Sequence, residues 1–130
     1  MKIHKPPKPQ LGPVDHIAIA VHNLAEAVDY YQNTLEFEAL ATPEDIVANG
    51  IRWFALGDGR ALHLIEVKGV TAPPRAHIAI QVEDNDAWRA YLEDKGVRLV
   101  EPTVELYAAK RFFLQDPSGN LIELVEWLTD

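Results

Sequence analysis

Two strand-like segments of nearly the same sequence lie 61 residues apart in this chain of 130 residues. The first is Val14-Asp-His-Ile-Ala-Ile-Ala-Val21 and the second is Arg75-Ala-His-Ile-Ala-Ile-Gln-Val82, and each carries a histidine at its third position. Branched residues alternate with histidine and small residues in both, as in a strand whose two faces meet different surroundings. The pattern predicts one face packed on a core and one face that lines a cavity beside the histidine.

The similarity extends beyond these strands, because the same order of predicted elements follows each of them. In the first half, Asn23 is expected to cap a helix that runs to about Leu35, and a short strand, a loop and a hairpin follow. The expected ranges are 36–41 for the short strand, 42–50 for the loop, and 51–56 and 60–67 for the hairpin strands. In the second half we expect a helix over 84–95 and strands over 97–100, 111–115 and 121–126.

The repeat predicts an α+β fold built from two tandem βαβββ modules, over about 13–68 and 75–128, with the proline-containing segment 67–75 between them. Their strands are expected to form one curved, partly closed mixed sheet with helices outside. Residues 1–12 are rich in proline and lysine, which favours an extended leader. Residues 13–130 are then expected to form a single domain.

Composition excludes several classes of function. The formal net charge is −8, which disfavours nucleic acid and an anionic membrane surface as partners. The sequence holds no cysteine, so disulfides and zinc–thiolate clusters are excluded. We find no apolar run of the roughly 20 residues that a membrane-spanning helix needs, and we expect a cytoplasmic protein.

The repeat also places two further ligand-type residues at equivalent positions. His63 follows His16 by 47 residues and Glu123 follows His77 by 46, each in the last strand of its module. Strand parity predicts that all four side chains project into one cavity. Three imidazoles and a carboxylate suit Zn, Ni, Fe, Co or Mn as a divalent ion and leave a coordination position open for a small-molecule substrate.

Three further residues are candidates for substrate contacts. Arg52 and Arg111 begin strands that we match between the two modules, and a guanidinium group is well suited to hold a substrate carboxylate. Tyr107 belongs to the loop over 101–109, which we interpret either as closing over a bound ligand or as a plain connection.

Taken together, these segments resemble the vicinal oxygen chelate superfamily, which includes glyoxalase I, bleomycin resistance proteins, fosfomycin resistance proteins, methylmalonyl-CoA epimerase and extradiol dioxygenases. The resemblance rests on the two histidine-containing strands, on Leu62-His-Leu-Ile-Glu66, and on the ending Phe113-Leu-Gln-Asp-Pro-Ser-Gly-Asn-Leu-Ile-Glu-Leu-Val-Glu126. It implies the paired βαβββ fold, a homodimer, and a divalent metal that binds two oxygens of a substrate. By position, His16, His63, His77 and Glu123 match the metal ligands of the superfamily.

The resemblance implies a metal-dependent lyase or isomerase of the glyoxalase type, acting on a small oxygenated metabolite. In that scheme the metal stabilises an enediolate, and Glu123 or a metal-bound water removes the proton. One alternative is a metal-free protein that binds a drug or small molecule, as bleomycin resistance proteins do. Another is an Fe-dependent dioxygenase or a fosfomycin-type thiol transferase. The sequence is compatible with a site inside one chain and with a site shared across a homodimer.

Overall fold

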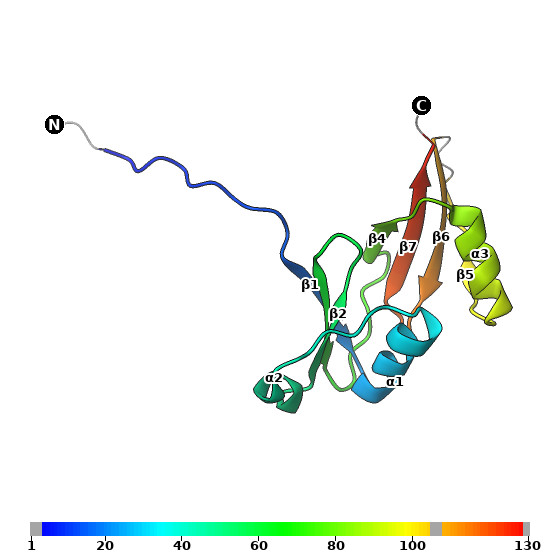
Figure 1. Ribbon diagram of the computed structural model, residues 1–130, viewed down its shortest axis with the longest axis horizontal. Helices are drawn as coiled ribbons and strands as arrows, with labels where there is room; N and C mark the ends of the chain where they lie inside the picture. Colours follow the sequence, from blue (N-terminus) through cyan, green and yellow to red (C-terminus); the bar gives the residue numbers. More distant parts are fainter. Residues whose placement is uncertain (1–3, 105–107, 129–130) are drawn as a thin grey trace.

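The seven strands of the protein form two separate hydrogen-bonded sheets in the computed structural model, which describes residues 4–104 and 108–128 (Figure 1). The first sheet has the order β1-β3-β2 and the second the order β4-β7-β6-β5. In each sheet the first strand of the module runs parallel to the last strand, and the other neighbours are antiparallel. The bounds are β1 His16–Val21, β2 Ile51–Ala55, β3 Ala61–Glu66, β4 His77–Gln81, β5 Leu99–Val100, β6 Ala109–Gln115 and β7 Leu121–Trp127.

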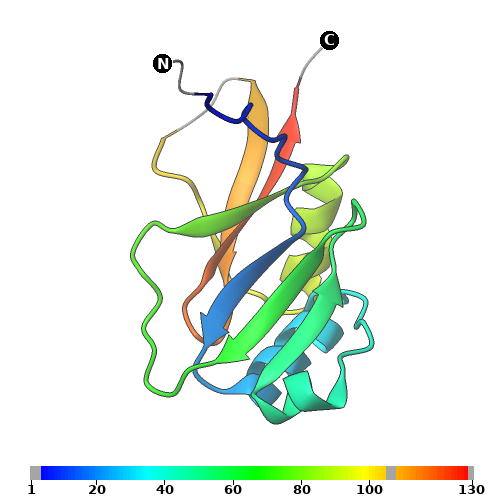
Figure 2. The same ribbon diagram turned by 90° about the vertical axis from the view of Figure 1, so that its left-hand side faces the viewer.

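The predicted α+β fold of two tandem modules is confirmed by this arrangement. One detail differs, since the strands divide between two sheets and do not form the single continuous sheet that the repeat suggested. In both sheets, nevertheless, one face packs on the core with the helices and the other face is uncovered. In Figure 2 the strands of both modules lie in front of helices α1 (Leu24–Asp29) and α3 (Asn85–Asp94).

Two of the predicted helices begin where the sequence placed them. Helix α1 (Leu24–Asp29) is capped by Asn23, and α3 (Asn85–Asp94) is capped by Asp84; each cap side chain accepts a hydrogen bond from a backbone N–H three residues on. Such caps satisfy donors that the first turn leaves free. After Asp29 the helix continues as a π-helix, η1 (Tyr30–Thr34), in which Leu35 N–H donates to the Tyr30 carbonyl. The wider turn still leaves the Tyr31 and Leu35 side chains buried.

Two expectations for the first module were wrong. Residues 36–41 form only one isolated bridge, between Ala39 and Phe54. Glu36 has a φ of 57°, a left-handed conformation that interrupts an extended strand. The predicted loop over 42–50 contains a short helix, α2 (Glu44–Ala48), whose first turn carries Glu44 and Asp45. Acidic residues are favourable there because the helix N-terminus carries partial positive charge.

The two modules share one hydrophobic core on the helix-covered side of the sheets. Leu62 and Leu64 of β3 are buried in it, together with Phe112 and Leu114 of β6. Because successive side chains of a strand point to opposite faces, His63 between the two leucines lies on the uncovered face. The core therefore decides which face of each sheet can carry a site.

A buried carboxylate ties the turn between β6 and β7 to the first module. Asp116 is 4% exposed and accepts hydrogen bonds from the Tyr31 hydroxyl at 2.9 Å and from the Ser118 and Asn120 backbone N–H groups. Asn120 in turn donates to the carbonyl of Ala20 in β1 at 2.9 Å. Burial, and then the charge of Asp116, raise the pKa of Tyr31 above its ordinary value, so the hydroxyl stays a donor.

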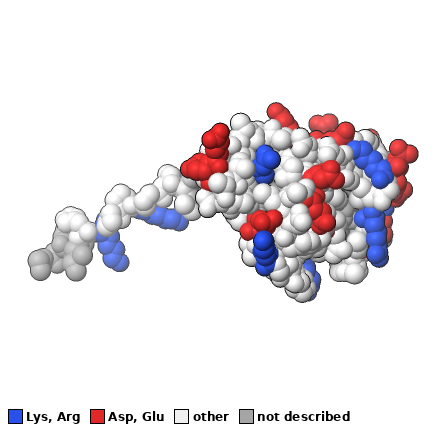
Figure 3. Space-filling view, turned by 90° about the horizontal axis from the view of Figure 1, so that it is seen from below, with Lys and Arg blue, Asp and Glu red and all other residues white. Residues whose placement is uncertain are grey.

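The segment before β1 extends away from the body of the protein (Figure 1). Residues 4–15 form neither helix nor strand, and all of them are exposed. Basic side chains lie along this segment, and acidic side chains are spread over the body in Figure 3. No helix within 4–104 and 108–128 is long and apolar enough to cross a membrane.

Replacing Tyr31 with phenylalanine should lower the free energy of unfolding by about 2 kcal/mol, because the buried Asp116 carboxylate would lose a donor. Tyr30→Phe is the matched control, since the buried Tyr30 hydroxyl has no hydrogen-bond partner among the described residues. That control should cost less than about 0.5 kcal/mol. Urea denaturation of both variants measures the difference, and equal costs would contradict the role given to Asp116.

Candidate metal centre

In the first module, His16 and His63 lie against each other on the uncovered face of the sheet. β1 and β3 are parallel, and Ala18 is the register partner of His63. The two imidazole rings stack with centroids 4.0 Å apart and planes inclined by 14°. His16 Nδ1 lies 2.8 Å from the Asp15 carboxylate. An N–H donated to that carboxylate leaves Nε2 of His16 with a free lone pair, which is the state in which histidine binds metals.

The other face of the His63 ring is covered by Trp53. Trp53 is the register partner of His63 across β2 and β3, and the two rings stack at 4.7 Å between centroids. The pKa of His63 is lowered, first by burial and second by the nearby charge of His16 when that ring is protonated. His63 is therefore held in its neutral form, which a cation can bind without displacing a proton.

In the second module, His77 and Glu123 form the equivalent pair. His77 Nε2 lies 3.1 Å from Glu123 Oε1, and the carboxylate side chain is only 8% exposed. His77 Nδ1 lies 2.9 Å from the Arg75 carbonyl, which can only accept, so Nδ1 carries the hydrogen. Nε2 and an ionised Glu123 then present two lone pairs to the same point. Two acceptors at this distance need a shared proton or a metal cation between them.

The two pairs match in detail but do not come together within one chain. His77 is the counterpart of His16, and Glu123 the counterpart of His63, because the parallel registers of the two modules coincide. In the part of the chain that the structure describes, which includes all four residues, no three histidine or acidic side chains are grouped closely enough to hold a metal ion. The residues predicted from the sequence are thus brought together two by two.

The three candidate substrate residues have different positions. Arg111 lies on the same face as Glu123, and its Nη1 is 3.4 Å from Glu123 Oε2. Arg52 is exposed, and it lies on the opposite face of its sheet from His63, since its register partner is the core residue Leu64. Tyr107 lies outside the described residues.

The match that we drew between Arg52 and Arg111 is one residue out of register. Trp53 faces His63 as Phe113 faces Glu123. The true counterpart of Arg111 in the first module is therefore Ile51, which pairs with Ile65 as Arg111 pairs with Val125. Matching the two arginines by sequence gave a register that is wrong by one residue, because pairing across the strands decides which residues share a face.

Two contacts of the site were missed at the level of sequence. Asp15 holds the Nδ1 hydrogen of His16, and Trp53 covers His63. Asp15 directly precedes His16 in the sequence, and a carboxylate beside a candidate ligand is a signal that could have been used. The stacking of Trp53 needed the register of β2 against β3, which the sequence does not state.

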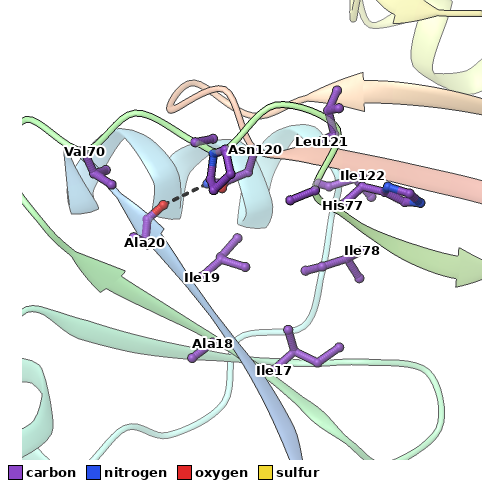
Figure 4. Close-up of a pocket in the computed structure, with 13 residues that line it drawn as sticks. Ile17, Ala18, Ile19, Ala20, Val70, His77, Ile78, Asn120, Leu121 and Ile122 are labelled. Atoms are coloured by element: carbon purple, nitrogen blue, oxygen red, sulfur yellow. Dashed lines mark hydrogen bonds between the residues drawn. The ribbon is translucent and has the colours of Figure 1, made fainter.

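An apolar cavity of about 320 Å³ lies between β1 and β4, next to the second pair. Ile17 and Ile19 of β1 and Ile78 of β4 line it, and Asn120 closes one side through its bond to Ala20 (Figure 4). The His77 ring points away from this cavity in Figure 4. The cavity separates the first strands of the two modules; His77 is one of its lining residues, and His16, His63 and Glu123 are not.

A family model described as the glyoxalase/bleomycin resistance protein/dioxygenase superfamily matches residues 14–124, which include both modules and all four candidate ligands. The chain belongs to this superfamily. Within the superfamily it is similar to an ethylmalonyl-CoA/methylmalonyl-CoA epimerase of Cereibacter sphaeroides, at 30% identity over 88% of this chain and 97% of the relative. It is also similar to the metallothiol transferase FosB of Staphylococcus epidermidis, at 26% identity over 85% and 81%.

Among solved structures, a glyoxalase family protein from Bacillus anthracis has the same fold as this superfamily member. The TM-score is 0.82 at 26% identity, and the match covers 92% of this chain and 98% of the other. The distant relatives thus carry the names of enzymes with different chemistries on one shared fold. The fold alone does not select among them, so the residues of the site must do so.

The pKa of His63 gives a test of the stacked pair in the metal-free protein. Replacing His16 with glutamine should raise this pKa, because the repulsion from a protonated His16 is removed while part of the burial remains. His22→Gln should leave the pKa of His63 unchanged, since His22 contacts Glu26 and not the pair. An NMR titration of the histidine ring protons measures both effects, and an unchanged or lower pKa in His16→Gln would contradict the stacking.

The direction of the pH effect on stability follows from the same shift. The pKa of His63 is lower in the folded chain than its ordinary value, so the unfolded chain binds the proton more readily. This residue therefore destabilises the fold as the pH falls below 6.5 towards the folded-state pKa.

Proposed function

We propose that this superfamily member is a divalent-metal-dependent enzyme that acts as a homodimer. Each site combines His16 and His63 of one copy with His77 and Glu123 of the other. The observation that carries the proposal is the presence of two matched ligand pairs that stay apart within one chain. A single pair offers too few ligands for a stable metal site, and a second copy of the chain supplies the missing half.

The donor atoms of the two pairs suit a metal ion. In the first-strand histidines, Nδ1 is engaged by Asp15 or by the Arg75 carbonyl. Nε2 keeps its lone pair, which in His77 faces Glu123 Oε1 at 3.1 Å. Metal-binding histidines are held in this way in most protein sites, because the second hydrogen bond fixes the tautomer and the ring orientation. Three imidazoles and a carboxylate suit Zn, Ni, Fe, Co or Mn, and an octahedral ion would retain positions for substrate oxygens.

The chemistry we infer is that of a glyoxalase-type lyase or isomerase on a small oxygenated metabolite. A divalent ion at this site would supply polarisation of the substrate carbonyl. Glu123 Oε1 takes the proton from the carbon next to that carbonyl and returns it to a neighbouring position or face. The burial of Glu123 favours this role, since a carboxylate with little access to water loses little solvation when it accepts a proton.

The named relatives support the proposal without deciding it. Epimerisation next to a thioester carbonyl and glyoxalase-type isomerisation both begin with removal of a proton beside a carbonyl. The name of the staphylococcal relative indicates a metal-dependent transferase. The ligand pairs of this chain are compatible with all of these reactions. The buried Glu123 carboxylate beside His77 is the observation that favours a proton-transfer reaction.

Mixing two inactive variants tests the shared site. His16→Ala and Glu123→Ala homodimers should each lose stoichiometric Ni²⁺, because every site lacks a ligand. After the two variants are unfolded and refolded together, the mixed dimers should regain one intact site, since one copy supplies His16 and its partner supplies Glu123. Metal content of the isolated mixed dimer, measured by elemental analysis, reports the result.

His22→Ala is the control for the metal measurement, because His22 lies outside both pairs, and it should retain the metal content of the unchanged protein. A mixed dimer without metal would contradict a shared site. A His16→Ala protein with full metal content would contradict the metal centre itself, and light scattering that finds a monomer at micromolar concentration would contradict the dimer.

Replacing Glu123 with glutamine should abolish proton exchange while the amide keeps the size of the side chain. We expect the metal-loaded protein to exchange the proton beside the carbonyl of methylmalonyl-CoA, or of a small α-hydroxycarbonyl compound, for solvent deuterium. The rate in Glu123→Gln should fall by a factor of about 100 or more, as expected for loss of a general base. NMR in deuterated water measures the exchange, and equal rates would contradict the role of Glu123.

A further inference from the structure

Arg111 is a partly buried arginine of β6 whose contacts all lie around the Glu123 carboxylate. Its side chain is 15% exposed, and Nη1 lies 3.4 Å from Glu123 Oε2. Nη2 donates to the carbonyl of Val104, and the guanidinium carbon lies 5.7 Å from the centre of the Phe113 ring. The guanidinium group is therefore held by three neighbours beside a candidate metal ligand.

The two oxygens of Glu123 have different partners as a result. Oε2 faces Arg111 at 3.4 Å, and Oε1 faces Nε2 of His77 at 3.1 Å. An arginine on one oxygen fixes the rotation of the carboxylate, since the planar guanidinium group is rigid. Oε1 is thereby directed to the point where the His77 lone pair also converges.

The first module shows what this position holds when the candidate ligand is not a carboxylate. Ile51 occupies the place of Arg111 in the strand pairing, and the imidazole of His63 occupies the place of Glu123. The aromatic neighbour is kept in both modules, as Trp53 and as Phe113. Arginine thus occurs only in the module whose ligand is an anion, which links the arginine to the carboxylate and not to the fold of the strand.

The position of Arg111 also costs free energy, because one of its buried donors is left without a hydrogen-bond partner among the described residues. Nε of Arg111 is buried and has no hydrogen-bond partner among the described residues. Buried donors are nearly always paired, because an unpaired one loses its hydrogen bonds to water. The position of the side chain is therefore set by its contacts with Glu123 and Val104.

We propose that Arg111 is a positioning residue that holds Oε2 of Glu123 and so presents Oε1 alone to the metal ion and to the proton that the reaction transfers. This inference rests on the proposed function and deepens it, because it states how one ligand is kept in a single orientation. Without Arg111 the carboxylate is free to turn and to bind a cation through both oxygens.

Co²⁺ titration of the chelator-treated full-length dimer tests the proposal, because the visible absorption of Co²⁺ reports its coordination number as well as its binding. Arg111→Met should bind Co²⁺ about 10- to 100-fold more weakly, as when other outer partners of metal ligands are removed. Its visible absorption should also weaken, since a second carboxylate oxygen raises the coordination number. Arg111→Lys should give an intermediate affinity, because it keeps the charge but not the rigid fork.

Arg89→Met is the matched control, since Arg89 also pairs with a carboxylate, that of Glu101, away from the site. This control should bind Co²⁺ with unchanged affinity and spectrum. If circular dichroism shows that Arg111→Met does not fold, Arg111→Lys decides: weaker binding with an altered spectrum supports the proposal, and an unchanged affinity and spectrum overturns it.

The failure of this inference can be told apart from the failure of the proposed function. If the unchanged protein binds Co²⁺, His16→Ala does not, and folded Arg111→Met binds it with the same affinity and spectrum, then Arg111 has no positioning role and the metal centre stands. If the unchanged dimer binds no Co²⁺, the metal centre and the role of Arg111 are both overturned.

Discussion

The buried carboxylate of Asp116 is the interaction on which the relation of the two modules depends. It accepts hydrogen bonds from Tyr31 of the first module and from the turn that starts β7 in the second. A buried charge is tolerated only when donors surround it, so loss of one donor is costly. Because this turn is also bonded to β1 through Asn120, the network connects two parts of the first module to the start of β7 in the second.

In the described part of one chain, the four matched candidate ligands lie as two pairs. Each module builds its own pair from its first and last strands, which are parallel neighbours in both sheets. The contacts inside a pair depend only on that register and are short, such as the 3.1 Å between His77 and Glu123. The distance between the pairs depends on module packing, and in the arrangement that the shared core holds, no three of these side chains are grouped among the residues that the structure describes.

The two modules differ in charge around their candidate ligands while they share the same strand register. The first holds two stacked imidazoles between Asp15 and Trp53, and burial lowers the pKa of His63. The second holds a buried carboxylate against a histidine and an arginine. A carboxylate needs a cationic neighbour to stay ionised away from water, whereas a neutral imidazole does not. This physical difference explains why the two ligand-type pairs share a strand register but have different charged neighbours.

The sequence by itself determined the fold class, the helix cap at Asn23, and the face of each strand that carries His16, His63, His77 and Glu123. These features follow from local rules, namely the period of two along a strand and the capping of a free backbone donor. Only the tertiary structure decided that Ile51, and not Arg52, is the counterpart of Arg111, because register depends on pairing across strands. It alone decided that the candidate ligands lie in two pairs, because no local pattern encodes how one module packs on the other, a packing to which the buried Asp116 contributes.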